Sequence, residues 1–234
     1  GGVAGGRSAY GRESQVPVRT HPGRAPLCLH AVHKLMVEEY LSVYRRVYGI
    51  RSIVARLTNP YGPGQPASRV AYGVVNRLVH LALERQALPI YGDGGNVRDW
   101  LHVEDHCAGL LQVLAQGRLG EKYNIGGGNE RTNLEIVDRI CDAAERLRPA
   151  RQNPALDGRS YRDLKTFVPD RPGHDRRYAI DAAKIRRELG WTPRHSFEDG
   201  LAATAQWYSD HREWCEQIQG TYTRERLGSL KSKV

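Results

Sequence analysis

The sequence predicts an α/β fold that contains part of a doubly wound sheet. Helix-like and strand-like hydrophobic patterns alternate along most of the chain, and glycine-rich turns separate them. The 234 residues are 40% hydrophobic and 26% charged, as in ordinary globular proteins. This length is enough for one domain of good size, and the composition excludes a chain dominated by disorder.

The first predicted elements are a helix over 33–48 and a strand over 50–57. Apolar residues recur at helical spacing in the first range, and Gly49 is a typical C-terminal cap. The second range is rich in β-branched and aliphatic residues. A further helix is expected over 70–84.

The alternation continues through the middle of the chain. A strand over 88–91 leads into a glycine turn at 92–94, and another short strand is expected over 100–103. The next helix opens at Glu104 and ends near residue 116. Residues 123–125, Tyr-Asn-Ile, then precede three glycines.

Capping signals mark three helices in the last part of the chain. A capping box at 132–135 begins the first of them. The other two begin after Asp181 and near Ser196, and the last carries Trp207 and Trp214.

Composition and charge exclude several classes of partner. The net charge of +9 comes from 35 Lys+Arg against 26 Asp+Glu, but the basic residues are scattered and no recognition helix or aromatic platform accompanies them, so we expect no nucleic-acid partner. No apolar run approaches the roughly 18 residues of a membrane span. The cysteines lack metal-like spacing, so we expect reduced thiols in the cytoplasm and no metal site.

The glycine-rich start of the chain does not fit a dinucleotide-binding loop. No strand precedes Gly1–Gly6 and no amphipathic helix follows it, whereas such a loop lies between a strand and a helix. We therefore expect that the chain lacks the cofactor half of the sheet and that it does not bind NAD tightly by itself.

Three segments carry a family resemblance. They are Arg-Leu-Thr-Asn-Pro-Tyr-Gly-Pro-Gly-Gln at 56–65, Ile-Tyr-Gly-Asp-Gly at 90–94 with Arg-Asp-Trp-Leu-His-Val-Glu-Asp at 98–105, and the stretch 161–181 with its Asp-Arg-Pro-Gly-His-Asp block. With them, residues 5–214 resemble the extended short-chain dehydrogenase/reductase family of NAD-dependent epimerases and dehydratases. The stretch 161–181 looks most like the C-terminal portion of the dTDP-glucose 4,6-dehydratases.

The resemblance implies a partial Rossmann-like doubly wound sheet, without its N-terminal cofactor half, and a small C-terminal α/β substrate domain. We expect a remnant of the Rossmann-like domain with a degraded catalytic segment at 1–65, mainly the sugar-nucleotide substrate domain at 66–214, and a basic tail at 215–234. The resemblance also implies NAD as the cofactor, a nucleotide sugar as the substrate, and a cytoplasmic lyase of nucleotide-sugar metabolism. It allows a homodimer.

The catalytic segment departs from the family pattern. In the family, a tyrosinate accepts the sugar hydroxyl proton while NAD takes a hydride from C4, and a lysine four residues later lowers the tyrosine pKa from about 10. Here Lys34 is present and His30 stands at the tyrosine position. His30 is either a substitute base or a drifted, non-catalytic residue. Lys34 either keeps the cofactor contact or forms an exposed pair with Glu38.

The groups that would remove water from the sugar are also altered. The family's adjacent Asp-Glu pair aligns with Arg7 and Ser8, and neither can act as a carboxylic acid. The family's Ser/Thr, which would orient the sugar hydroxyl, aligns with Gly5 or Gly6. Whether the chain is a catalyst is therefore left open.

The family's substrate-binding residues persist in this sequence. A sugar nucleotide carries a diphosphate, and the planar fork of arginine meets phosphate oxygens with two hydrogen bonds at once. The residues that the resemblance assigns to substrate binding are Asn59, Arg98, Asn124, Arg171 and His174. Each also has a purely structural interpretation, such as an exposed pair of Arg98 with Asp99 or a turn-forming asparagine. Their joint occurrence in family order favours a substrate site.

The sequence thus predicts a protein like the NAD-dependent nucleotide-sugar 4,6-dehydratases, which convert dTDP-glucose to a 4-keto-6-deoxy sugar, in a truncated or catalytically impaired form. A UDP-glucose 4-epimerase-like enzyme is one alternative, because it needs no Asp-Glu pair and because Gly73-Val74-Val75-Asn76 looks more like that enzyme. A non-catalytic sugar-nucleotide-binding subunit is the other.

Overall fold

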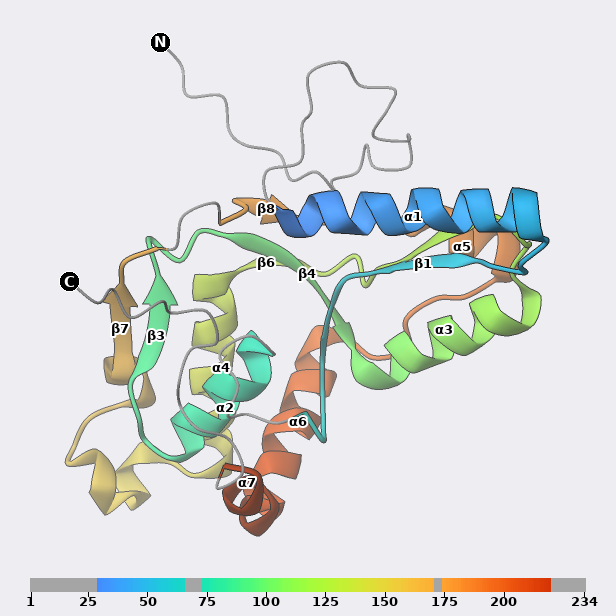
Figure 1. Ribbon diagram of the computed structural model, residues 1–234. Helices are drawn as coiled ribbons and strands as arrows, with labels where there is room; N and C mark the ends of the chain where they lie inside the picture. The colour runs from blue at the N-terminus through green and yellow to red at the C-terminus, as the bar shows by residue number, and fades with distance from the viewer. Residues whose placement is uncertain (1–28, 66–72, 171–173, 220–234) are drawn as a thin grey trace. The chain divides into compact units, whose positions relative to one another are not determined.

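The computed structural model describes residues 29–65, 73–170 and 174–219 (Figure 1). The chain divides into two compact units, each assembled from separate segments. The first unit holds the chain up to Pro60 with Ile90–Glu135 and Phe167–Phe197, and the second holds Tyr61–Pro89, Ile136–Thr166 and the chain from Glu198. The expected domain boundaries after residues 65 and 214 stay a prediction.

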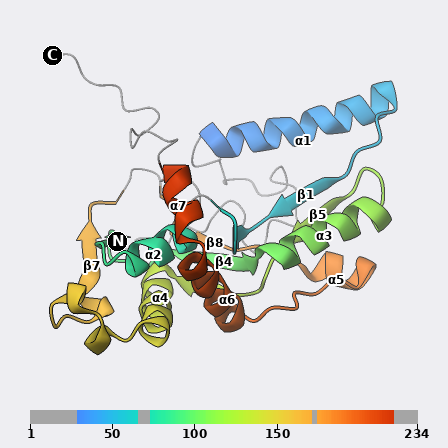
Figure 2. The same cartoon turned by 90° about the horizontal axis from the view of Figure 1, so that it is seen from below.

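The first unit is built around a pair of parallel strands. Strand β1 (Val54–Leu57) pairs in parallel with β5 (Lys122–Ile125). Helix α1 (Leu29–Tyr48) lies along one side of this pair and α3 (Val103–Gln116) lies on the other (Figures 1 and 2). Helix α5 (Ala183–Leu189) packs against β5 and α3, so the predicted α/β alternation is confirmed here.

Strand alternation explains which face of the pair is apolar. Successive side chains of a strand point to opposite faces. Leu57, Tyr123 and Ile125 belong to the hydrophobic core that α3 and α5 cover, while Arg56 and Asn124 alternate with them. A polar face is thereby left toward α1.

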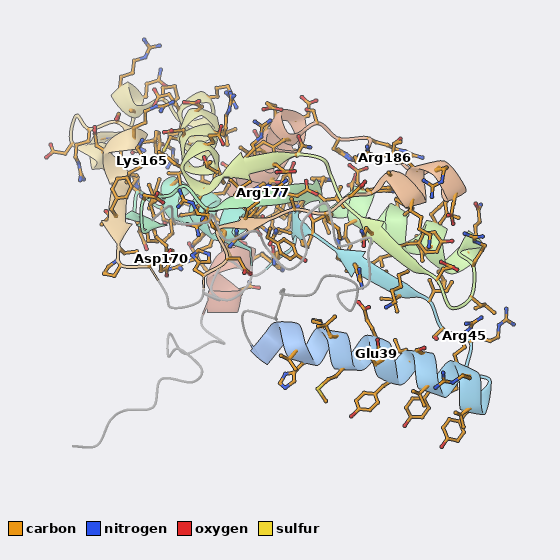
Figure 3. The ribbon with its side chains drawn as sticks, turned by 90° about the horizontal axis from the view of Figure 1, so that it is seen from above. Glu39, Arg45, Lys165, Asp170, Arg177 and Arg186 are labelled. Carbon is orange, nitrogen blue, oxygen red and sulfur yellow. The ribbon has the colours of Figure 1, made fainter. Side chains whose placement is uncertain are left out.

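Ion pairs between Glu38 and two basic residues hold helix α1 on this polar face. The Glu38 carboxylate accepts hydrogen bonds from Arg56 Nε at 2.8 Å, from Arg56 Nη2 at 2.7 Å and from Lys122 Nζ at 2.6 Å. The helix ends as predicted, since Gly49 follows with a φ of 68°, a conformation that glycine adopts without strain. Figure 3 shows aromatic side chains projecting from the opposite face of α1.

A second sheet has β4 (Val97–His102) at its centre. This strand pairs with β2 (Asn59–Tyr61), runs antiparallel to β6 (Glu130–Thr132) and runs parallel to β8 (Arg177–Tyr178). It begins three residues before the predicted strand at 100–103. Strands β3 (Leu88–Tyr91) and β7 (Lys165–Val168) form a separate pair.

The second unit is mainly helical. It contains α2 (Val74–Leu83), most of α4 (Asn133–Leu147) and of α6 (Phe197–Asp210), α7 (Arg212–Gln219), and the short turns η3 (Ala150–Gln152), η4 (Pro154–Leu156) and η5 (Tyr161–Leu164). Buried apolar residues recur every three to four positions along α2 and α4, as a core-facing helix requires. The predicted capping box of α4 is confirmed: Thr132 N donates to Glu135 Oε2 at 2.7 Å and Glu135 N donates to Thr132 Oγ1 at 3.1 Å.

The helix predicted to carry both Trp207 and Trp214 is in fact two helices. Helix α6 ends at Asp210 and α7 begins at Arg212. At the break, the ring Nδ1 of His211 lies 2.8 Å from Trp207 O, which also accepts the His211 backbone N–H. The side chain thus competes for a carbonyl of the helix ladder. Helix α7 reaches Gln219 and so overlaps with the predicted tail.

The described cysteines agree with the expectation of reduced thiols. Cys107, Cys141 and Cys215 are all free. Burial raises the pKa of the Cys141 thiol to about 11, and its Sγ donates to Tyr161 O, so this thiol is structural. Among the described helices, none is both long and apolar enough to cross a bilayer.

Candidate functional site

Asn59 lies where β1 leads into β2, next to the centre of the β4 sheet. Its Nδ2 donates to the backbone oxygen of Asp99 at 3.3 Å, and the neighbouring Thr58 Oγ1 donates to the same oxygen at 2.9 Å. Side chains that follow a strand of a parallel pair often line ligand sites in α/β proteins. Here they also fix the end of β1 against β4.

The side chain of Asp99 performs the same task for the end of β5. Its Oδ2 accepts from Gly127 N at 3.0 Å and its Oδ1 accepts from Asn129 N at 2.8 Å. Burial raises the pKa of this carboxyl, since the residue is only 1% exposed, although the backbone donors oppose that effect. A Cβ on Gly127 would lie 2.2 Å from Trp100 O, so only glycine allows this close approach. The alternative of an exposed Arg98–Asp99 pair is therefore wrong.

Arg98 is half-buried on β4, between a second arginine and a tyrosine. It stands opposite Arg131 across the antiparallel pair and opposite Tyr178 across the parallel pair. Its Nη1 donates to Val97 O at 2.7 Å. Arg131 places its guanidinium 5.0 Å from the centre of the Phe197 ring. Like charges directly opposite in a sheet destabilise it, so a nearby anion would be favourable here.

His174 lies in a segment that is hydrogen-bonded to the start of β4. Its Nδ1 is 2.7 Å from Asp170 Oδ1. The residues that follow it are fixed by Asn96 Nδ2, which donates to Asp175 O at 3.2 Å, and by Val97 N, which donates to Arg176 O at 2.8 Å. The structure thus brings Asn59, Arg98 and the His174 segment to one strand.

Asn124 has a structural task in the same unit. It is buried, and its Nδ2 donates to Asp181 O at 2.9 Å. Asp181 Oδ1 in turn accepts from Ala183 N, the first residue of α5, at 2.8 Å. Asp181 therefore contacts the start of the helix as predicted, but the N-cap position itself is Ala182. Asn124 therefore fixes the chain that enters α5.

Lys34 is exposed on α1. In the described structure, the pair with Glu38 that was one interpretation of Lys34 does not form, because Arg56 and Lys122 surround that carboxylate. Hydrogen bonds from these two residues outweigh the effect of burial and hold the pKa of Glu38 below its usual 4.5. Lys34 thus lies on a helix that is held in place by Glu38, four residues further along, through its contacts with Arg56 and Lys122.

Several predicted site residues lie outside what the structure describes. They are Arg171, the side chain of His30, and the altered catalytic positions Gly5, Gly6, Arg7 and Ser8. His30 itself lies in the first turn of α1. The roles of these residues stay predictions.

The organising role of Asp99 and the position of Arg131 were not predicted from the sequence. The available signal for a buried hydrogen-bonded carboxylate is the apolar pair Trp100-Leu101 that directly follows Asp99 in the strand. No local signal identifies Arg131, because its neighbour Arg98 is distant in sequence. Together, Arg98 and Arg131 provide positive charge beside polar strand ends, an arrangement suited to a phosphorylated ligand.

Comparisons with known proteins identify the family. The GDP-mannose 4,6-dehydratase family model matches residues 3–204. A dTDP-glucose 4,6-dehydratase of Neisseria meningitidis serogroup B is 46% identical over 209 residues, which cover 88% of this chain and 57% of the relative. The chain therefore spans about half the length of the curated relatives it matches.

Solved structures give the same result for the fold. The dTDP-glucose 4,6-dehydratase DesIV of Streptomyces venezuelae, crystallised with NAD, has a TM-score of 0.71 and 39% identity over 83% of this chain and 55% of its own. The dTDP-glucose 4,6-dehydratase of Bacillus anthracis, in complex with NAD, has a TM-score of 0.72 and 38% identity over 92% of this chain and 61% of its own. The similarity confirms a partial Rossmann-like dehydratase/epimerase fold.

Proposed function

The chain belongs to the extended short-chain dehydrogenase/reductase family, in its nucleotide-sugar dehydratase branch, and from this premise we propose that it forms the sugar-nucleotide-binding part of a dTDP-glucose 4,6-dehydratase-like protein. The observation that carries the proposal is the convergence of Asn59, Arg98 and the His174 segment on β4. The crystallised relatives bear the name dTDP-glucose 4,6-dehydratase and bind NAD. A cytoplasmic location is part of the proposal, since the described cysteines are free thiols.

Arg98 is the residue proposed to hold the diphosphate. Its half-buried position lowers the local dielectric around the guanidinium, which strengthens a charge-assisted hydrogen bond. Arg131 lies directly across the sheet and adds positive charge. Asn59 is proposed to present its amide beside them, and His174 to line the same site. Asn124 is proposed to shape the site indirectly, through the entry to α5.

NAD would supply the hydride acceptor of the dehydratase reaction when it is bound. The described residues offer it only Lys34, and within the described ranges no strand passes through a glycine-rich turn directly into a helix, the unit that binds dinucleotide phosphates. These residues do not fit NAD by themselves. With His30 at the tyrosine position and Arg7 and Ser8 in place of carboxylic acids, the proposed protein is catalytically impaired.

Titration calorimetry of the whole chain with dTDP-glucose and with UDP-glucose tests the proposal. Arg98→Ala should weaken dTDP-glucose binding by about 1.5 to 3 kcal/mol, the value of a hydrogen bond to a charged group. Arg187→Ala is the matched control, because Arg187 is exposed on α5. Equal affinity of the wild type and Arg98→Ala would remove Arg98 from the site. A preference for UDP-glucose would support the epimerase-like alternative instead.

A further inference from the structure

Metal-ligating side chains cluster at the junction of β4 and α3. His102 ends β4, Glu104 lies in the first turn of α3, and His195 lies in the loop before α6. One donor atom from each residue lies within 4.8 Å of the other two. All three belong to the first compact unit, and none is assigned to the sugar nucleotide.

The spacing of two of the donors is an ion-pair distance that is also close to the separation of two ligands of one zinc ion. His195 Nε2 lies 3.2 Å from Glu104 Oε2. Zinc binds nitrogen and oxygen ligands at about 2.0–2.2 Å in a tetrahedron, so neighbouring ligand atoms are roughly 3.3–3.5 Å apart. The His102 and His195 rings lie with their centroids 4.2 Å apart and their planes tilted by 34°, so the third donor group lies directly against the second.

A fourth residue orients His195 without being a ligand. Asp105 Oδ2 lies 3.1 Å from His195 Nδ1, and the same carboxylate accepts the backbone N–H groups of Arg194 and His195, both at 3.0 Å. Metal-bound histidines commonly donate their second ring N–H to such a carboxylate. With the proton on Nδ1, the lone pair of Nε2 points toward Glu104.

The burial of the cluster suits an ion that enters from solvent. His102 is only 4% exposed and anchors the inner side, whereas the Glu104 side chain is 70% exposed and that of His195 is 31% exposed. The positive end of the α3 dipole opposes a cation there. The carboxylates of Glu104 and Asp105 in the first turn offset that effect.

We propose that His102, Glu104 and His195 bind a zinc ion, with Asp105 holding the His195 ring. Two imidazoles and one carboxylate are a ligand set that suits zinc and leaves a fourth position for water. The ion would tie the loop before α6 to the end of β4. No metal site was expected from the spacing of the cysteines, and His195 is too far in sequence from His102 and Glu104 for the three to form a spacing motif.

Calorimetric titration with zinc chloride tests the proposal on the untagged whole chain, after treatment with EDTA and dialysis. We expect one saturable site. Glu104→Gln and His195→Gln should each weaken zinc binding by more than about tenfold, since loss of an outer-shell partner alone costs about 10- to 100-fold. His211→Gln, an exposed histidine at the break between α6 and α7, is the matched control and should bind as the wild type does.

Cobalt provides a second measurement that does not depend on heats. Four-coordinate Co²⁺ absorbs visible light far more strongly than the hexaaqua ion, so the wild type should give the strong bands and His195→Gln should lose them. Circular dichroism confirms that each variant is folded, and both substituted side chains are partly exposed. Absence of a saturable zinc site in the folded chain, retained affinity in either ligand variant, or only the weak six-coordinate cobalt spectrum would overturn the proposal.

Discussion

Replacing Glu38 by glutamine should destabilise the protein more than a typical surface substitution. The Glu38 and Arg56 side chains are 10% and 12% exposed, and the carboxylate also accepts from Lys122 at 2.6 Å. Glutamine keeps one acceptor oxygen but removes the negative charge that faces the Arg56 guanidinium in a largely buried position. Removing one partner of a buried ion pair costs about 3–5 kcal/mol. Since one acceptor survives and Lys122 reaches solvent, we expect a loss of about 2–3 kcal/mol in the free energy of unfolding.

Urea denaturation at neutral pH measures this loss, with Glu213→Gln, at an exposed position of α7, as the matched control. The pKa of Glu38 is lowered in the folded state, so its stabilising contribution is present above its usual pKa of 4.5 and is lost as the pH falls through the lower folded value. The gap between wild type and Glu38→Gln should therefore stay constant from pH 6 to 8 and shrink in acid below about pH 4.5. If the unfolding free energy of Glu38→Gln, like that of the control, stays within about 0.5 kcal/mol of the wild type at pH 7, the ion pair does not hold α1 in place.

Three further predictions concern the site, the cofactor and the partner. Asp99→Asn should lower the free energy of unfolding, measured in urea, by about 1–3 kcal/mol, because the new NH₂ group would face a backbone N–H that now donates to the carboxylate. No loss would mean that burying the charge costs as much as its hydrogen bonds contribute. The chain by itself should show no tight NAD binding in calorimetry, and low-micromolar affinity would refute the missing-cofactor-half interpretation. If the exposed apolar face of α1 forms the homodimer contact, Tyr40→Glu with Val47→Glu should give a monomer in light scattering, whereas Leu114→Glu on α3 should not.

Local signals in the sequence predicted most of the helices and strands. The Gly49 cap, the Thr132–Glu135 capping box and the bond from Ala183 N to Asp181 each involve residues within a few positions of one another, so their chemistry can be inferred without tertiary structure. The break between α6 and α7 was missed because a histidine inside a helical pattern is not a recognised breaker.

Partners that are distant in sequence could not be predicted in the same way. Local spacing suggested Lys34 as the partner of Glu38, whereas its actual partners Arg56 and Lys122 meet it only because β1 and β5 pair beneath α1. The opposed arginines on β4 and β6 depend on strand register in the same manner. Family resemblance located Arg98, but the position of Arg131 required the sheet.

Asp99 and Arg98 show how stability and ligand binding are divided between neighbours. Adjacent residues of a strand point to opposite faces, so the buried carboxylate of Asp99 and the proposed diphosphate ligand Arg98 are positioned by the same register. A slip of β4 by one residue would bury the guanidinium and expose the carboxylate. Asp99 itself is too buried to touch a ligand, yet it joins the ends of β1 and β5. Loss of Asp99 should therefore weaken sugar-nucleotide binding together with stability, whereas loss of Arg98 should weaken binding with a smaller effect on unfolding.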